Sequence, residues 1–275
     1  MIEEQEGLVE ALSGEMTPKF LATRSAGGVP NVVPCTTLMQ APDSGAGDVP
    51  DRLIFGNFLM RKSSANLDAD ARVGILVITT NLDGWVLQGD FAGWQRAGAY
   101  VDRLNSTDLL RYNPYTGIRA AGIVDVRRVV RAFSIPRLRV AADFFLARLA
   151  GHGFPLPDEA VAMPRAARTH FSPLMAVRVL AFLDQQGYPL IAPVLSLQPA
   201  GDRALACAYG VAGDMLASLE AGALVAANQL TLDVVSFQAR GRWLGSQRVL
   251  GTRVGTMSVE ALFAGGPPVP GRQLA

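Results

Sequence analysis

The chain has 275 residues, of which 49% are hydrophobic, and its formal net charge is +1. This composition is typical of a globular protein with one large or two modest domains, and it argues against a disordered chain. The near-neutral charge disfavours a nucleic-acid partner, because such proteins carry a basic excess or a basic face. Residues 127–139 are the nearest candidate, and their alternation of arginine with apolar residues favours the solvated face of a strand over nucleic-acid contact.

The N-terminal segment 1–12 is acidic and amphipathic, the opposite of a secretory leader. No window approaches the roughly 18 consecutive apolar residues of a membrane span, so we expect no membrane partner. Cys35 and Cys207 are too few and too far apart for a disulfide framework, which favours a cytoplasmic location. The only histidines are His152 and His170, and neither cysteine has a metal-ligand companion, so we expect no metal site.

Four segments of the chain recur in the same order, which indicates a doubled unit, with chance similarity between β-rich segments as the alternative. The first pair has no gap, and each of its copies predicts two strands joined by a glycine-containing turn. The second pair predicts a short helix followed by a strand. The matching segments are 20–41 with 179–200, 64–79 with 216–231, 83–94 with 233–244, and 123–133 with 253–263.

The repeated unit is predicted to be three strands, a short helix and three more strands. Short antiparallel connections and little helix favour a small closed barrel over a parallel α/β sheet. The predicted fold class is therefore mainly β with a few helices, in two tandem barrels, and residues 136–153 have the apolar spacing of a helix. The predicted boundaries are a first barrel in 1–150 with an inserted helix and loop at 95–118, a linker and helix in 151–175, a second barrel in 176–265, and a loose tail in 266–275.

The two copies differ in charge at the start of their short helix. The first copy has Arg61, Lys62 and Ser63 where the second has Gly213, Asp214 and Met215. Two cations and a hydroxyl at a helix start suit a phosphate, whereas an acid repels it. The first copy therefore predicts a phosphate site held by Lys62, with a solvated surface turn as the alternative.

An insertion at residues 95–122 distinguishes the first copy further. It contains Tyr112, Asn113, Tyr115 and Arg119 around a proline- and glycine-containing turn. Aromatic and arginine side chains on a loop near a phosphate turn could cover a flat ligand. A helix and loop that plug one end of the barrel are the alternative.

The segments LATRSAGGVPNVVP, RLIFGN, RKSSANLDADARVGIL and GWVLQG follow one another within residues 17–94. Together they resemble the FMN-binding split barrels of the pyridoxamine 5′-phosphate oxidase-like superfamily. The resemblance implies two tandem split β-barrels, the second copy degenerate, with FMN at the interface between them and pairing into a homodimer.

The resemblance also implies which residues bind the cofactor. Arg61, Lys62 and Ser63 would hold the phosphate, and Phe55, Gly56 and Asn57 would line the ribityl chain. Cys35 and Thr36 would lie near the isoalloxazine. The glutamine early on the fifth strand of the oxidases that name the superfamily is Gly84 or Trp85 here, and their C-terminal substrate-binding segment has no counterpart, so the resemblance does not support pyridoxamine phosphate oxidation.

Two functions follow from these features. The first is an FMN-dependent oxidoreductase that acts on an unknown small-molecule substrate, with Tyr112, Asn113, Tyr115 and Arg119 as candidates for substrate or flavin-ring contacts. The second is a non-catalytic protein that binds a flavin, the deazaflavin F420 or haem. Haem requires an axial ligand, and both histidines fall in the predicted linker region. The F420 phosphate would also suit Arg61 and Lys62.

Overall fold

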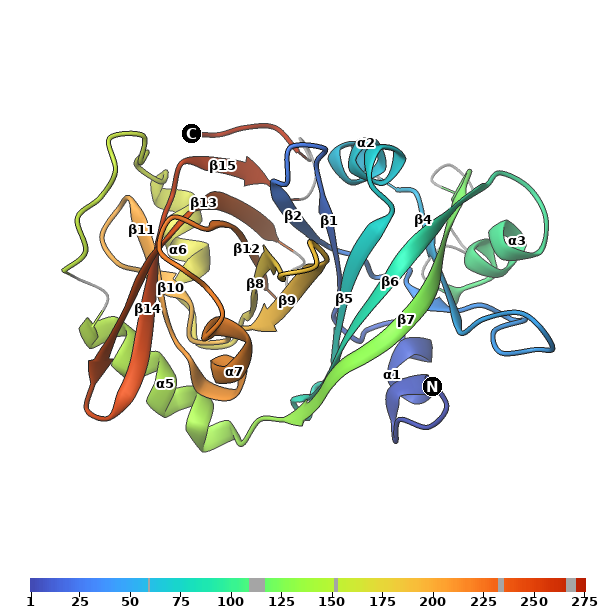
Figure 1. Cartoon of the computed structure of the whole chain (residues 1–275), viewed down its shortest axis with the longest axis horizontal. Coiled ribbons are helices and arrows are strands. Elements are labelled where there is room, and N and C mark those ends of the chain that lie inside the picture. Colours follow the sequence, from blue (N-terminus) through green and yellow to red (C-terminus); the bar gives the residue numbers. More distant parts are fainter. Residues whose placement is uncertain (59, 109–116, 151–152, 232–234, 266–270) are drawn as a thin grey trace.

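A computed structural model describes the chain except for residues 59, 109–116, 151–152, 232–234 and 266–270 (Figure 1). The described residues form two antiparallel sheets with a few helices, so the predicted mainly β fold class is confirmed. The sheets lie side by side, and the chain passes from one to the other through a long helix below them (Figure 1).

The first unit has a sheet in the order β2-β1-β5-β6-β7-β4-β3. Its elements are α1 (Leu8–Ser13), β1 (Lys19–Arg24), β2 (Pro30–Pro34), β3 (Met39–Gln40), β4 (Arg52–Gly56), α2 (Arg61–Ala69), β5 (Arg72–Ile78), β6 (Asp83–Gln95), α3 (Ala99–Asn105) and β7 (Ala121–Ser134).

The second unit has a sheet in the order β9-β8-β12-β13-β14-β11-β10, with β15 paired to β13. Its elements are α5 (Arg137–Ala150), α6 (Arg165–Phe171), β8 (Val177–Leu183), β9 (Pro189–Pro193), β10 (Gln198–Pro199), β11 (Ala204–Ala208), the 3-10 turn η2 (Gly210–Ala212), α7 (Gly213–Leu216), β12 (Leu224–Leu230), β13 (Ser236–Val249), β14 (Thr252–Ser258) and β15 (Ala261–Ala264). Each strand of the first sheet therefore has a counterpart in the same position of the second.

The two hairpins show why the same local sequence folds the same way twice. Gly28 and Gly187 adopt φ values of 77° and 78°, a left-handed conformation that glycine enters without steric cost. Equivalent backbone hydrogen bonds close both turns, at 2.9 Å from Gly28 to Ser25 and at 2.9 Å from Gly187 to Asp184. The hairpins β1–β2 and β8–β9 are therefore equivalent in both sheets.

The units pack face to face around one shared core. Phe20, Val32 and Leu76 of the first unit belong to the same buried cluster as Ile191 and Ala226 of the second. β2 contacts β8, β12 and β13, and in the reciprocal contact β9 packs against β1, β5 and β6. The core residues of each unit are therefore buried in part by the other unit.

Backbones approach closely where β5 meets β9. A Cβ atom added to Gly74 would lie 2.3 Å from the carbonyl oxygen of Pro189. Only glycine is compatible with that approach, because any side chain would push β9 away from β5.

Helix α5 belongs to the second unit. It packs against β10, β11 and β14 and buries Phe144 and Ala147, and the carbonyl of Phe144 accepts a hydrogen bond of 2.6 Å from Gln198. The boundary predicted at residue 150 is therefore wrong, since the division between the units falls before α5.

The chain end is also more ordered than predicted. Residues 271–275, which we expected to be part of a loose tail, hydrogen-bond to β15, with Leu274 donating to Leu262 at 2.7 Å and Leu262 donating to Ala275 at 3.0 Å. This edge strand leaves backbone groups unpaired, and the returning chain satisfies them. Across the described part of the chain, none of the helices has the length and apolar character needed to span a bilayer.

Replacing Gly74 by alanine should destabilise the protein by about 1–3 kcal/mol, because the added methyl group overpacks the junction. Urea unfolding of the two proteins measures this difference. Gly27→Ala is the matched control, since a Cβ there has its nearest neighbour at 3.8 Å. Equal stability of Gly74→Ala and the parent would contradict the close approach of β5 and β9.

Candidate functional site

Helix α2 presents its first three residues in three directions. Arg61 is exposed, Lys62 is half-buried and Ser63 is fully buried. The helix follows Met60, whose side chain does not cap it. The predicted phosphate residues therefore lie together at the helix start, while their side chains face different surroundings.

Ser63 takes part in a polar network that crosses the junction between the units. Its hydroxyl accepts a hydrogen bond of 3.1 Å from the Asn31 side chain. The oxygen of the same Asn31 amide accepts a bond of 3.0 Å from Gln238 on β13, which also donates to the carbonyl of Val32 at 2.8 Å. Ser63, Asn31 and Gln238 are all buried, so the network fixes the start of α2 against the second unit.

Lys62 meets the second unit at an aromatic ring and a second cation. Its Nζ atom lies 2.9 Å from the ring centroid of Phe263 on β15. The guanidinium of Arg240 on β13 lies 4.7 Å from the same centroid. Figure 1 shows α2 and β15 on the same upper edge of the molecule. Lys62 and Arg240 therefore share one aromatic side chain at the junction.

These two cations are half-buried, and each has one shielded nitrogen without a hydrogen-bond partner in the described part of the chain. Lys62 Nζ and Arg240 Nε are both shielded from solvent, and within the described residues neither atom has a hydrogen-bond partner. Burial, together with the charge of Arg240, lowers the pKa of Lys62 to about 8. Burial also lowers the pKa of Arg240. Buried cations without acceptors are costly, and an anion bound between them would remove that cost.

A second, equivalent junction has β6 and α7 in the places of β13 and α2, and its residues differ in charge. The strand ladders pair Gly74 with Gln88 in the first sheet and Ala226 with Arg240 in the second, so Gln88 is the counterpart of Arg240. The match of residues 83–94 with 233–244 is therefore out of register by two residues. Asp214 is the counterpart of Lys62.

The residues equivalent to Arg240 and Lys62 have partners within the protein at this second junction. Gln88 donates to Asp184 at 3.0 Å and to the carbonyl of Pro189 at 3.2 Å. Asp214 pairs with Arg131 at 2.8 Å. The positions of Lys62 and Arg240 are therefore taken, at the second junction, by side chains that have partners within the protein.

The strand that leads to α2 contributes mainly backbone and core groups. The Phe55 ring is fully buried and contacts Trp94, with ring centroids 5.7 Å apart. Gly56 donates its backbone N–H to the Thr37 hydroxyl at 3.0 Å, and the Asn57 side chain accepts 3.1 Å from the hydroxyl of Ser64. Of these three predicted ribityl-lining residues, Asn57 is thus the one with an exposed side chain tied to α2.

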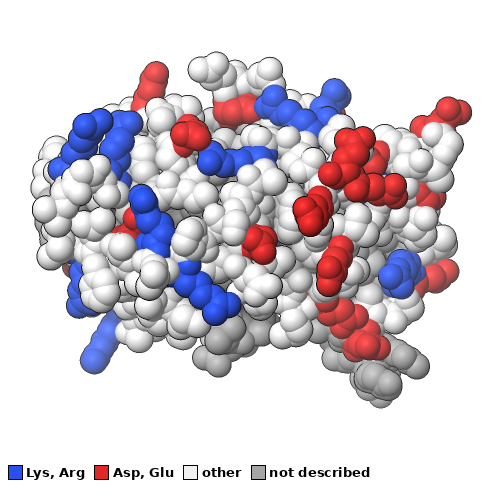
Figure 2. Space-filling view, turned by 90° about the horizontal axis from the view of Figure 1, so that it is seen from below, with Lys and Arg blue, Asp and Glu red and all other residues white. Residues whose placement is uncertain are grey.

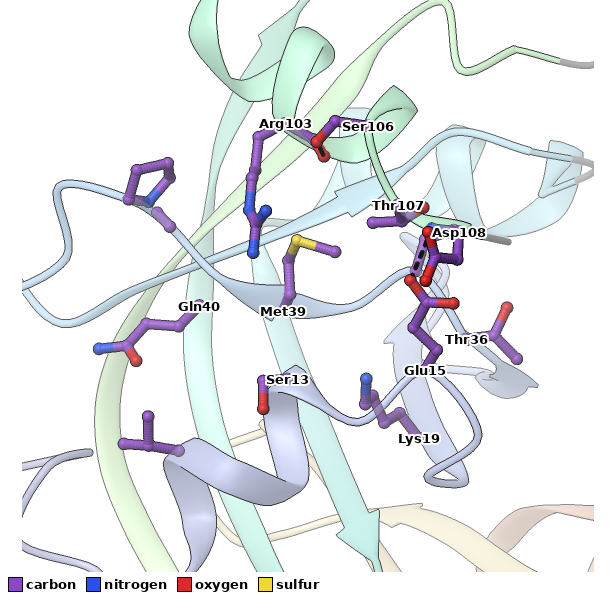
Figure 3. A pocket seen from close by; sticks show the side chains of 14 residues that line it. Ser13, Glu15, Lys19, Thr36, Met39, Gln40, Arg103, Ser106, Thr107 and Asp108 are labelled. Atoms are coloured by element: carbon purple, nitrogen blue, oxygen red, sulfur yellow. Dashed lines mark hydrogen bonds between the residues drawn. The ribbon is translucent and has the colours of Figure 1, made fainter. Parts of the chain in front are cut away.

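Cys35 and Thr36 lie at the other end of β2. Burial raises the pKa of the Cys35 thiol to about 12, so it remains a protonated core residue. Thr36 is exposed and lines a cavity of about 570 Å³ between α1, α3 and the 36–42 loop (Figure 3). Lys19, which the sequence did not single out as a site residue, lines the same cavity.

Of the four predicted loop residues, one lies in the described part of the chain. Tyr112, Asn113 and Tyr115 lie outside the described residues. Arg119 is exposed beyond the loop. The proposed contacts of these four residues with a ligand therefore stay predictions.

The arginines of β7 are paired with acids. Arg127 pairs with Asp90, Arg128 with Asp184 at 3.2 Å, and Arg131 with Asp214. Figure 2 shows acidic side chains gathered toward the end that carries the N-terminus and basic ones toward the end that carries α5. The basic segment read from the sequence is thus neutralised along the strand.

Comparison with known proteins gives matches at the level of solved structures. No family model and no curated protein matches the sequence. Several of the solved structures that this chain resembles are split barrels of the pyridoxamine 5′-phosphate oxidase-like group, each covering about half of it. They include an FMN-binding protein from Syntrophomonas wolfei, HupZ from Group A Streptococcus and an F420 reductase. Two other solved structures cover most of this chain at TM-scores of 0.28 and 0.24: YcgR from Escherichia coli in complex with c-di-GMP, over 92%, and the inhibitor of motility MotI from Bacillus subtilis, over 88%.

The degree of similarity is low in each case. The FMN-binding protein is 17% identical, covers 50% of this chain and 88% of its own, and has a TM-score of 0.38. HupZ is 18% identical over 46% of this chain and 90% of its own, with a TM-score of 0.37. The F420 reductase is 21% identical over 47% and 98%, with a TM-score of 0.34. The functional evidence therefore comes from this chain's own residues.

Lys62 and Lys19 are the only lysines, so protein labelled with ¹³C at lysine Cε should give two side-chain NMR signals. Both should titrate near pH 8 rather than at the ordinary 10.5. Arg240→Gln should raise the Lys62 midpoint, because it removes the neighbouring charge, and should leave Lys19 unchanged. Two midpoints near 10.5 would show that the amines are solvated.

Proposed function

We propose that this chain binds FMN at the junction between its units, with the phosphate held by Lys62 and Arg240. The observation that carries the proposal is the pair of half-buried cations at that junction, whose shielded Lys62 Nζ and Arg240 Nε atoms have no hydrogen-bond partner among the described residues. A phosphate monoester supplies up to two negative charges and three acceptor oxygens, which match an ammonium and a guanidinium group. F420 also contains a phosphate and is the alternative cofactor.

Each unit has a separate part in this site. The first unit supplies Lys62 from α2, and Arg61 beside it is exposed and adds positive charge at the entrance. The second supplies Arg240 from β13 and Phe263 from β15, whose ring covers one side of both cations. The Ser63–Asn31–Gln238 network holds the two units in register at that point.

We further propose that the chain is an oxidoreductase. Bound flavin would supply the electron transfer, so the protein needs only to bind, orient and shield the reacting groups. Asn57 follows β4 and Thr36 follows β2, and the Gly56–Thr37 hydrogen bond joins these two segments. The exposed Asn57 side chain and the Thr36 cavity would receive the rest of the cofactor and a small-molecule substrate. Non-catalytic storage of the same cofactor is the other outcome, and turnover assays distinguish the two.

Lys62→Gln and Arg240→Gln should each weaken FMN binding roughly 10- to 100-fold, because each removes one charge-assisted hydrogen bond to the phosphate. Flavin fluorescence titration measures the dissociation constants. Riboflavin, which lacks the phosphate, should bind all three proteins equally. Asp214→Asn at the opposite junction is the matched control and should leave FMN affinity unchanged. Full FMN affinity of both glutamine variants would refute the assignment.

FMN affinity should also depend on pH. Lys62 binds an anion in its protonated form, so affinity should be constant below pH 8 and fall above it. The decrease should approach about tenfold per pH unit, because a single proton is involved. Calorimetric titration from about pH 7.5 to 9.5 tests this, since the phosphate is almost completely in its dianionic form over that range. Riboflavin should show no such decrease, and a flat FMN profile would exclude Lys62 as the phosphate ligand.

A further inference from the structure

The chain contains few lysines. Only two of its 25 Lys and Arg residues are lysine. Arginine is protonated at every ordinary pH, so among these 25 residues only the two lysines can lose their charge and become nucleophilic amines. Lys62 belongs to the proposed phosphate site, which leaves Lys19 without an assigned role.

Lys19 is buried at the wall of a cavity. It is the first residue of β1, is 2% exposed and lines the 570 Å³ space beside Thr36. Its Nζ atom donates a hydrogen bond of 2.8 Å to the carbonyl of Leu12, the last turn of α1. A neutral amine held by one N–H bond keeps a lone pair for reaction.

The surroundings of Lys19 favour the neutral amine while keeping acid–base groups close. Burial lowers the pKa of Lys19 to about 8, although Glu15 and Cys35 act in the opposite direction. The Glu15 carboxylate accepts the backbone N–H of Asp108 at 2.8 Å. Arg103 and Asp108 are the other charged groups that line the cavity.

The cavity walls are polar on two sides. Figure 3 shows the Lys19 amine and the Arg103 guanidinium directed into the space from β1 and from α3. The hydroxyls of Ser13, Thr36 and Thr107 lie around them. An amine nucleophile and a separate guanidinium, which binds carboxylates, match a small molecule that carries both a carbonyl and a carboxylate.

We propose that this cavity binds a small oxo acid, with the carbonyl carbon joined to Lys19 as an imine and the carboxylate on Arg103. The neutral amine adds to the carbonyl carbon, so a C–N bond forms, a first N–H proton passes to the oxygen, and the oxygen becomes a hydroxyl. Glu15 takes the second proton that the nitrogen loses and returns it to the hydroxyl, which leaves as water when the C=N bond forms. The step involves no change of oxidation state and does not depend on a flavin.

Reductive trapping tests this directly. The full chain, without added flavin, is incubated with glyoxylate and cyanoborohydride, and peptide mass spectrometry locates the carboxymethyl group. Lys19 should be labelled with saturable dependence on glyoxylate and at least about 10-fold faster than Lys62, because the cavity positions the reagent. The Lys19 rate should rise with pH and level off above about 8. Lys62 has a similarly lowered pKa, so a difference between the two reports the cavity and not basicity.

Two variants complete the test. Lys19→Arg keeps a donor for the Leu12 carbonyl and cannot form an imine, so this position should carry no label in a protein with an unchanged circular dichroism spectrum. Arg103→Gln should abolish saturation by glyoxylate while leaving labelling by acetaldehyde, which has no carboxylate, unchanged. The proposal is overturned if Lys19 stays unlabelled, or if label spreads equally over Lys19, Lys62 and the α-amino group without saturation.

Discussion

The contact between β5 and β9 is the constraint on which the rest of the structure depends. Because Gly74 lacks a side chain, the carbonyl of Pro189 can approach it, and the hairpins of each unit then lie against the strands of the other. That packing brings β13 and β15 to α2. Without it Lys62 would be an ordinary surface lysine at a helix start. Its burial, its ring contact with Phe263 and the proximity of Arg240 all come from the second unit. The site is thus a product of the junction and not of either sheet alone.

The fold contains two equivalent junctions between the units, and the charged and polar residues at them differ. At one, Gln88 and Asp214 find partners within the protein. At the other, Arg240 and Lys62 occupy the equivalent places and have unpaired buried donors among the described residues. Unpaired buried charge costs stability unless it is compensated. A fold that satisfies one junction with its own side chains could satisfy the other in the same way. The two cations therefore support the proposed ligand from outside the chain, and their sign favours an anion.

Local chemistry in the sequence was enough to locate the hairpins around Gly28 and Gly187, the helix at α5 and the cationic start of α2. It could not give the register of β13. A shift of two residues preserves the alternation of a strand, so matching Gln88 with Gln238 satisfies the same pattern as matching it with Arg240. The apolar spacing of α5 predicts a buried face and not which sheet covers it. Lys19 has no local signal at all, because its burial depends on α1, which precedes it, and on α3, which lies far along the chain.

The two lysines show how one pKa can serve two purposes. Burial brings both amines to a pKa of about 8, but what each amine faces decides which form is useful. Next to Arg240 and a phosphate, the protonated form of Lys62 is the one that binds, and the anion stabilises it. In a cavity with a carbonyl compound, the neutral form of Lys19 is the one that reacts. Raising the pH through 8 should therefore weaken the first site while activating the second. Arginine would hold the phosphate at every pH and would never form the imine. The proposed imine therefore needs lysine at position 19, and lysine at position 62 would make the proposed cofactor binding sensitive to pH.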